Sequence, residues 1–350
     1  MKLLILGGTC FLGRHIAELA LQRGHAVTLL HRGRSGPGLF PQAEHRIADR
    51  DDAGALASAL GSGSWDAAID TSAYVPRQVR TLAAALGTRL AHYPHYPHYP
   101  HYQLVSSISV YDSFDGSGTD EDSTTRTLSD PTVETITGDT YGGLKALCEQ
   151  AARAAFGPRC LVNRPGLLVG PHDPTGRFTW WVQRLQRGGV VLAPGDPATP
   201  VQFIDARDAA AWMLLQAERS TTGVFNLTGP AQPLTMNQFL TCARDTLDPG
   251  ATLQWVGEQY LQDQGVAPWS DLPVWLPHSD AGLHRTRIQR ALDTGLHCRP
   301  LPQTLRDTAQ WAAGVQARAA TAGALVRPPP GLAPEREAAL LAGWAAGGST

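Results

Sequence analysis

Lysine is nearly absent from this sequence. Only Lys2 and Lys145 occur, although lysine and arginine together number 29 against 31 acidic residues, and the formal net charge is −2. A chain with no excess of positive charge has no electrostatic reason to bind nucleic acid or an anionic membrane surface. We therefore expect neither as a partner, and we expect a small-molecule substrate.

Paired cysteines and long apolar runs are also missing. The odd number of cysteines and the lack of a CxxC spacing argue against a disulfide framework and against a zinc site. No apolar run approaches the roughly 18 residues that a membrane span needs, and the run after Met1 is too short for the core of a signal peptide. These absences predict a soluble cytoplasmic protein without a metal. The cysteines occupy positions 10, 148, 160, 242 and 298.

The chain has instead a regular alternation of strand and helix patterns. Short apolar runs typical of buried strands alternate with segments whose apolar residues recur at helical spacing. This alternation predicts an α/β fold with a doubly wound, Rossmann-like parallel sheet, which binds ligands at the carboxyl ends of its strands. The expected strands are 2–6, 26–30, 45–48, 67–70, 103–107 and 160–165, and the expected helices are 11–24, 51–60, 79–86 and 141–156.

The character of the chain changes after about residue 170. Glycine–proline loops interrupt shorter elements there, and eight of the nine tryptophans lie at position 180 or later. We interpret this part as a smaller C-terminal substrate domain, with a strand at 223–229 returning to the first domain. The expected division is 1–170 plus about 201–230 for the dinucleotide-binding domain, 171–200 and 231–316 for the substrate domain, and 317–350 for a tail with a short helix.

Residues 91–104 form a low-complexity segment of three HYP units followed by HYQ. Histidine-rich tracts can bind metal, and the candidate ligands are His92, His95, His98 and His101. Proline at every third position, however, favours an extended polyproline II chain with successive histidines about 9 Å apart, which forms no metal cage. We therefore interpret the segment as an exposed spacer between a helix and a strand, without a metal.

Residues 7–13, GGTCFLG, have the pattern of a phosphate-binding loop between a strand and a helix. Gly7 permits a sharp turn, Gly13 lets the helix approach the strand, and the N–H groups at the helix start face a diphosphate. Cys10 stands where a glycine is usual. A negative φ angle with the thiol turned aside would need only a small shift of the loop, whereas a positive φ would be strained. A redox-sensitive thiol is conceivable at a helix start, but a space-filling role is the simpler interpretation.

The end of the second expected strand bears on the choice of cofactor. An acidic residue there would accept hydrogen bonds from a ribose 2′-hydroxyl, but the sequence has Arg32 and Arg34 instead. Arginine suits a phosphate, so we expect NADP(H) to be preferred, with NAD(H) possible, unless both arginines are merely solvated. Asp49 is placed to accept a hydrogen bond from an adenine amino group, although a helix cap is an alternative role.

The segment Tyr141-Gly-Gly-Leu-Lys145 contains the clearest catalytic signal. Residues at i and i+4 lie on one face of a helix, so Lys145 is placed beside Tyr141. A phenol with an ordinary pKa of about 10 acts as a base near neutral pH only if a cation stabilises its phenolate. Ser107, at the end of the strand expected at 103–107, adds a hydroxyl. Alternatively, the serines after this strand only hydrogen-bond to the backbone.

Taken together, the segments GGTCFLG, SSISVY and YGGLK resemble the short-chain dehydrogenase/reductase superfamily, in its extended branch of NAD(P)-dependent epimerases and dehydratases. The likeness covers most of residues 1–315. It implies a catalytic triad of Ser107, Tyr141 and Lys145, and a homodimer is usual in the resembled group. The resemblance also implies that the cofactor contacts Thr9, Phe11, Leu12, Gly13, Thr71, Ser72, Ala73, Pro165 and Leu168.

Departures from this family pattern bear on the substrate. Ile108 and Ser109 occupy the places of an Asp-Glu pair found in sugar-nucleotide dehydratases, so we do not expect water elimination. Gln202 stands where epimerases of sugar nucleotides often carry a basic residue. Arg177 and Trp181 could line the substrate cleft, since aromatic faces suit sugars, although adjacent tryptophans are more often part of a core.

The loop 111–134 contains seven acidic residues and one arginine. It is either a lid beside Tyr141 that disfavours highly anionic substrates or a solvated surface loop.

These residues predict an oxidoreductase or epimerase acting on a secondary alcohol or ketone of a sugar-like or nucleotide-sugar molecule. Tyr141 would exchange a proton with the substrate oxygen, Ser107 would polarise that oxygen, and Lys145 would lower the pKa of the phenol and hold the nicotinamide ribose. The alternative is a non-catalytic Rossmann protein that senses a cofactor or binds RNA.

Overall fold

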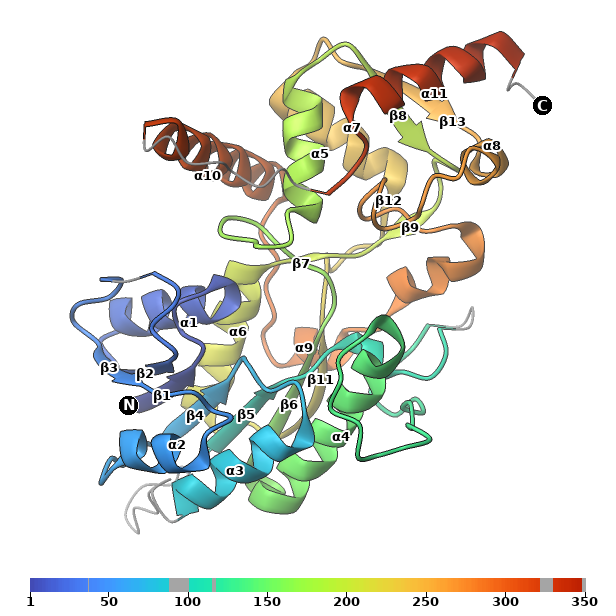
Figure 1. Ribbon diagram of the computed structural model, residues 1–350. Coiled ribbons are helices and arrows are strands. Elements are labelled where there is room, and N and C mark those ends of the chain that lie inside the picture. Colours follow the sequence, from blue (N-terminus) through green and yellow to red (C-terminus); the bar gives the residue numbers. More distant parts are fainter. Residues whose placement is uncertain (37, 88–100, 115–117, 322–329, 348–350) are drawn as a thin grey trace.

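The computed structural model describes residues 1–36, 38–87, 101–114, 118–321 and 330–347 (Figure 1). Its main element is a seven-stranded sheet in which every pair of neighbouring strands is parallel. Most of these strands are apolar runs buried on both faces, as a parallel sheet between helices requires. The strands are β1 (Lys2–Leu6), β2 (Ala26–His31), β3 (Glu44–Ile47), β4 (Ala67–Asp70), β5 (His101–Val105), β6 (Cys160–Pro165) and β11 (Gly223–Leu227).

The strands lie in the order β11-β6-β5-β4-β1-β2-β3. The order in which the chain adds strands changes sides at β1. The chain moves outward from β1 to β2 and β3, and then crosses to β4 on the other side of β1. The loops that follow β1 and β4 therefore diverge and leave a crevice at the carboxyl ends of these two strands. Doubly wound sheets bind their ligands at such a switch point.

Helices cover both faces of the sheet. The pair α1 and α6 packs on one face, and α2, α3 and α4 pack on the other (Figure 1). Side chains of β1 alternate between the two cores, because Leu3 and Ile5 face α1 and α6 whereas Leu4 and Leu6 face the opposite helices. These helices are α1 (Phe11–Gln22), α2 (Ala53–Leu60), α3 (Pro76–Leu86), α4 (Gly138–Phe156), α6 (Ala206–Arg219) and the short α9 (Gln289–Asp293).

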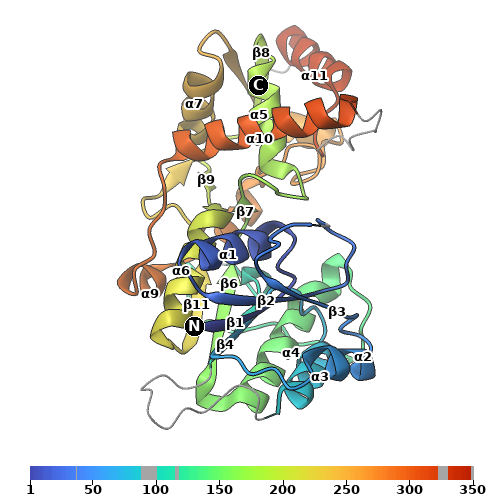
Figure 2. The same cartoon turned by 90° about the vertical axis from the view of Figure 1, so that its left-hand side faces the viewer.

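A second lobe has its own apolar core, which includes the fully buried rings of Trp181, Phe239 and Trp275. Helix α10 packs on α5 and α7 in this lobe, and Figure 2 shows it lying above α1 of the first lobe. The helices are α5 (Arg177–Gln186), α7 (Met236–Leu247), α8 (Glu258–Asp263), α10 (Leu301–Thr321) and α11 (Pro334–Gly347). Paired short strands are β7 (Leu168–Val169) with β10 (Ile204–Asp205), β8 (Val190–Pro194) with β13 (Thr252–Val256), and β9 (Pro200–Val201) with β12 (Leu234–Thr235).

The predicted fold class is confirmed, and the strand expected at 223–229 does return to the first sheet as β11 beside β6. Helix α10 continues to Thr321, so residue 316 lies inside a helix. The C-terminal helix α11 packs back on the second lobe, where Glu337 forms a buried ion pair with Arg184 of α5. No helix in the part of the chain that the structure describes is long and apolar enough to cross a membrane.

The low-complexity segment lies outside the described residues except for its last part. His101 and Tyr102 are buried in β5 rather than placed in an exposed spacer. The Nε2 atom of His101 lies 2.5 Å from the carbonyl oxygen of Thr221, and burial lowers the pKa of this histidine to about 4. His101 is therefore a core residue, and the expectation that it belongs to the spacer is wrong.

A buried ion pair fixes the end of β4 beside the crevice. The guanidinium of Arg50 donates hydrogen bonds of 2.7 and 2.8 Å to the two carboxylate oxygens of Asp70, which also accepts from the hydroxyl of Tyr102. Burial alone would raise the pKa of Asp70, but the charge and hydrogen bonds of Arg50 outweigh burial and lower it. The pair therefore holds the first residues of the loop after β4 in place.

Replacing Asp70 by alanine should destabilise the protein by about 3–5 kcal/mol at pH 7, because it leaves a buried guanidinium without its partner. The pKa of Asp70 is lowered in the folded state, so its stabilising effect is present above the ordinary carboxyl pKa of about 4 and is lost as the pH falls through the lower folded value. Urea unfolding at pH 7 and at low pH measures both effects.

The control is Asp245→Ala, which removes an exposed ion pair with the neighbouring Arg244 and should cost about 1 kcal/mol or less. Equal stability losses for the two variants would contradict the assignment of Asp70 as a structural anchor.

Candidate active site

A cavity of about 970 Å³ lies at the carboxyl ends of the sheet strands, between the two lobes. It is lined by the loop between β1 and α1, the loops after β2, β4 and β5, the start of α4, and parts of the second lobe. Most of the residues that the sequence singled out line this one cavity. They are Gly7, Thr9, Cys10, Phe11, Leu12, Gly13, Arg32, Arg34, Asp49, Thr71, Ser72, Ser107, Tyr141, Lys145, Pro165, Leu168 and Arg177.

The two glycines of the β1–α1 loop are required by close contacts. Gly7 has a φ of +86°, and a Cβ at this position would lie 2.6 Å from the hydroxyl oxygen of Thr71. A Cβ at Gly13 would lie 2.4 Å from the carbonyl oxygen of Gly7, so any side chain there would push α1 away from β1. The first turn of α1 therefore approaches the end of β1 closely, as a diphosphate site requires.

Cys10 fits the loop without strain at its own position. Its φ is −133° and its side chain is exposed. A negative φ is the case in which we expected the loop to accommodate a cysteine with only a small shift. Partial burial raises the pKa of the thiol, which argues against an acidic, redox-sensitive cysteine. The left-handed backbone conformation occurs one residue later, at Phe11, whose φ is +37°.

Polar groups from two strands face the part of the cavity beyond this loop. Arg32 and Arg34 follow β2 and are exposed, and Asp49 follows β3. The carboxylate of Asp49 accepts a hydrogen bond from the backbone N–H of Asp51, so it caps a turn as well as facing the cavity. No carboxylate stands at the end of β2 itself, as the sequence indicated.

Lys145 is buried on α4 and joins this helix to two strand ends. Its ammonium donates hydrogen bonds of 2.6 Å to the carbonyl oxygens of Ala73 and Val105, and it lies 5.3 Å from the centre of the Tyr74 ring. Burial lowers the pKa of Lys145. An ammonium has three N–H donors, so these two bonds leave one donor for a ligand in the cavity.

Tyr141 lies one turn before Lys145 on α4, and its phenol lies near the hydroxyl of Ser107. Burial raises the pKa of Tyr141, and the nearby hydroxyl of Ser107 lowers it to a smaller extent. The sequence led us to expect that Lys145 lowers the pKa of the Tyr141 phenol. This effect is not found, because the ammonium is directed at two backbone carbonyls. Ser107 donates to the hydroxyl of Ser109 at 3.0 Å and accepts from the backbone N–H of Ser109 at 3.1 Å, so its hydroxyl is held in place beside the phenol.

The second lobe supplies the far wall of the cavity. The guanidinium of Arg177, in the first turn of α5, lies 5.5 Å from the centre of the Trp269 ring. Trp269 has a φ of +64°, a conformation that costs a non-glycine residue energy and is concentrated at binding sites. Ile136 and Leu283 add apolar surface to the same cavity.

Ala73, Trp181 and Gln202 do not line the cavity, contrary to expectation. The methyl group of Ala73 is in the core under α3, and this residue contributes only its carbonyl oxygen to Lys145. Trp181 is fully buried in the second core, where its indole donates to the carbonyl of Pro273. The side chain of Gln202 is held by the backbone N–H and carbonyl of Thr286 at 3.0 and 2.9 Å.

The acidic loop packs on α4 without lining the cavity. A Cβ at Gly143 would lie 2.5 Å from Leu128. One at Gly142 would lie 3.0 Å from Arg126 and 2.1 Å from the carbonyl oxygen of Ser109. Glu121 is buried and accepts a hydrogen bond from the backbone N–H of Asn226. In the described part of this loop the acidic side chains thus stay away from the cavity, and the loop supports the helix that carries Tyr141.

Several lining residues were not predicted from the sequence. Arg50 and Tyr74 line the cavity from the segments after β3 and β4. Trp269 and Leu283 line it from the segment between α8 and α9. Arg50 and Tyr74 follow predicted strands, so their positions were a usable signal. Nothing in the local sequence marks Trp269, because its place depends on contacts between distant segments.

The residues of this cavity fit a nicotinamide dinucleotide. The glycine loop and the start of α1 would hold the diphosphate, the groups after β2 and β3 would face the adenosine, and Lys145 has one donor left for the nicotinamide ribose. Pro165 and Leu168 line the same cavity as Tyr141 and would flank the nicotinamide.

Solved structures with the same architecture include enzymes in complex with NAD. The UDP-glucose-4-epimerase of Stenotrophomonas maltophila, with bound NAD and formylated UDP-arabinopyranose, superposes with a TM-score of 0.67 at 17% identity, over 91% of this chain and 99% of that chain. The Bordetella bronchiseptica enzyme WbmH, in complex with NAD+, has a TM-score of 0.64 at 15% identity, over 89% and 98% of the two chains. At these identities the likeness establishes the fold.

The sequence itself carries the family assignment. Residues 3–228 match the NAD dependent epimerase/dehydratase family, and the chain belongs to this family, as the resemblance predicted. A curated relative, the chloroplast stem-loop binding protein of 41 kDa b of Arabidopsis thaliana, is 25% identical over 244 residues, which cover 65% of this chain. The match spans only 58% of the length of that relative.

Proposed function

We propose that this protein is a nicotinamide-dependent oxidoreductase or epimerase that acts on a secondary alcohol or ketone of a sugar-like or nucleotide-sugar molecule. The observation that supports this most strongly is that Ser107, Tyr141 and Lys145 line one cavity with the glycine loop of α1. Membership of the NAD dependent epimerase/dehydratase family supports the same class of reaction.

In the proposed mechanism, Tyr141 transfers a proton to or from the substrate oxygen. Because its pKa is raised, the phenol is protonated near neutral pH and can act as the acid when a carbonyl is reduced. Ser107, whose hydroxyl lies near this phenol, polarises the same oxygen, and Lys145 holds the nicotinamide ribose with its remaining donor. When bound, the nicotinamide supplies or accepts the hydride, which in an epimerase returns to the opposite face of the substrate.

The far wall of the cavity bears on the substrate. Arg177 is the cation at this end, and its contact with Trp269 orients the guanidinium beside an aromatic face. An aromatic face with one cation suits a sugar-like ring that carries a single anionic group nearby. Gln202 is held by Thr286, so the residue that stands in place of a basic epimerase side chain does not contribute here.

We further propose that NADP(H) binds more tightly than NAD(H), because Arg32 and Arg34 are the charged groups at the end of β2. Replacing both arginines by glutamine should weaken NADPH binding by about tenfold or more and change NADH binding little, since a charged hydrogen bond is worth about 1.5–3 kcal/mol. Fluorescence titration of both cofactors measures this. The structural relatives were solved with NAD, and tight NADH binding without NADPH binding would overturn the preference.

The catalytic proposal predicts that Tyr141→Phe lowers turnover by about 10²–10⁴-fold, because the proton donor is lost. Its cofactor affinity should stay within about twofold, whereas Lys145→Met should lose both turnover and cofactor affinity. The assay is a screen of ketoses, aldoses and nucleotide sugars with the bound cofactor, followed by kinetics on the best substrate.

Tyr260→Phe is the matched control, since this tyrosine lies in the second lobe and donates to the carbonyl of Leu340. Full turnover in Tyr141→Phe, with the control equally active, would contradict the proposed role of the phenol.

A non-catalytic protein that senses a cofactor or binds RNA is the alternative, and the Arabidopsis relative is named as a stem-loop binding protein. The net charge of −2 gives this chain no general attraction for a polyanion. Binding of a stem-loop RNA at physiological salt, together with no affinity for either dinucleotide, would favour the alternative over the enzyme.

A further inference from the structure

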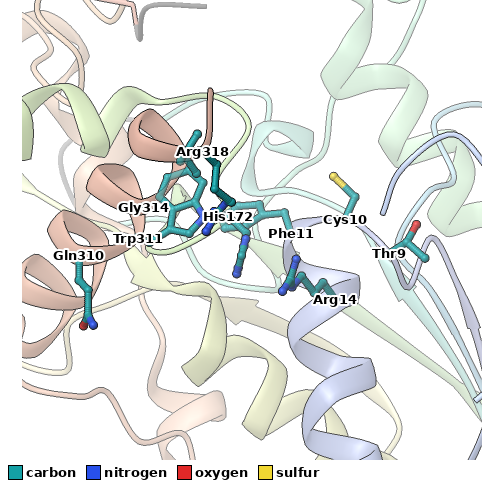
Figure 3. A pocket seen from close by; sticks show the side chains of 10 residues that line it. Thr9, Cys10, Phe11, Arg14, His172, Gln310, Trp311, Gly314 and Arg318 are labelled. Carbon is teal, nitrogen blue, oxygen red and sulfur yellow. The ribbon is translucent and has the colours of Figure 1, made fainter. Parts of the chain in front are cut away.

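A second cavity, of about 610 Å³, lies between the start of α1 and helix α10. Figure 3 shows its lining, with Phe11 and Arg14 coming from α1, Trp311 and Arg318 from α10, and His172 between them. We call it the α1–α10 cavity. Its size falls within the range of about 300–1,000 Å³ that is typical of small-molecule sites.

The charges around the α1–α10 cavity are of one sign. Arg14 and Arg318 line it from two different helices, and none of the described residues in its lining carries a carboxylate. The Nε atom of Arg14 is buried and has no hydrogen-bond partner. Burial and the charges of Arg14, His15 and Arg318 lower the pKa of His172, which lines the same cavity, to about 4.

Aromatic rings complete the lining. His172 lies 5.5 Å from Trp311 and 5.7 Å from His15, and His15 lies 6.3 Å from Phe11, measured between ring centres. Two of these residues have left-handed backbones, since φ is +70° at His172 and +37° at Phe11. Such strain is retained where it shapes a binding site.

We propose that the α1–α10 cavity binds a small phosphomonoester, with the phosphate between Arg14 and Arg318 and a ring of the ligand against Trp311. Guanidinium groups bind phosphate oxygens through charged, often paired hydrogen bonds, and the indole face provides the surface for a ring. A dianion supplies the negative charge that the lining lacks.

This site is separate from the candidate active site although the two are neighbours. Thr9, Cys10 and Phe11 line both cavities, whereas Arg14, Trp311 and Arg318 line only the second one. The proposal does not depend on the proposed enzymatic function, because it uses none of the catalytic residues.

Calorimetric titration of the full chain with phenyl phosphate and with inorganic phosphate tests the proposal, with and without saturating dinucleotide. Phenyl phosphate should bind in both conditions and about tenfold more tightly than inorganic phosphate, because only the former contacts Trp311. Arg318→Gln and Arg14→Gln should each weaken phenyl phosphate by about tenfold or more. Arg318 is exposed, so its replacement should leave the thermal unfolding temperature unchanged.

Arg306→Gln is the charge-matched control, because Arg306 is an exposed arginine on the same helix outside the cavity lining. It should leave phenyl phosphate affinity within about twofold. Absence of binding, or equal affinity for the two phosphates, would overturn the proposal. If Arg318→Gln weakened the dinucleotide as strongly as phenyl phosphate, the cavity would belong to the cofactor site and the proposal would also fail.

Discussion

The buried ammonium of Lys145 is the contact on which the candidate active site depends. A charge removed from water must be compensated by hydrogen bonds, and here two backbone carbonyls, one after β4 and one at the end of β5, provide them. Helix α4 is thereby fixed to two neighbouring strand ends. Because Tyr141 is one turn away on the same helix, its phenol is held beside Ser107, which follows β5.

Other buried ion pairs stabilise the strand ends to which Lys145 is bonded. Arg50 and Asp70 fix the loop after β4, whose Ala73 carbonyl receives the Lys145 ammonium. Glu149, one turn beyond Lys145, accepts from Arg164 of β6 and from the hydroxyl of Ser106. The polar interior is thus a chain of paired groups that runs along the carboxyl ends of three strands. In a chain with only two lysines, the single lysine on α4 therefore has a structural task as well as the proposed catalytic one.

The nucleotide loop shows how a missing glycine is accommodated. Gly7 and Gly13 are where contacts with Thr71 and with the Gly7 carbonyl leave no room for a Cβ. Position 10 has an extended backbone, so a cysteine fits, and the unusual conformation occurs at Phe11 instead. Glycine is therefore required at positions 7 and 13 for steric reasons, whereas position 10 can carry a side chain.

The sequence predicted those parts of the fold and site that depend on local spacing. Alternating patterns identified the strands of the main sheet, and the i, i+4 relation identified Tyr141 and Lys145. Contacts between distant segments were not predictable in this way. Trp181 was a candidate for a core or a cleft, and Trp269 was not singled out. Only the packing of the second lobe buries the first and exposes the second to the cavity. The side chain of Gln202 is bonded to the backbone of Thr286, 84 positions later, and so does not reach the cavity. No local sequence pattern predicts such a bond.

A crystal structure of the protein with an oxidised nicotinamide dinucleotide tests the central claim most directly. The account predicts that the diphosphate lies over the first turn of α1, that the nicotinamide ribose accepts a hydrogen bond from Lys145, and that the Tyr141 hydroxyl faces the reactive side of the nicotinamide ring. A dinucleotide bound elsewhere, or a nicotinamide ring separated from Tyr141 by packed side chains, would contradict it.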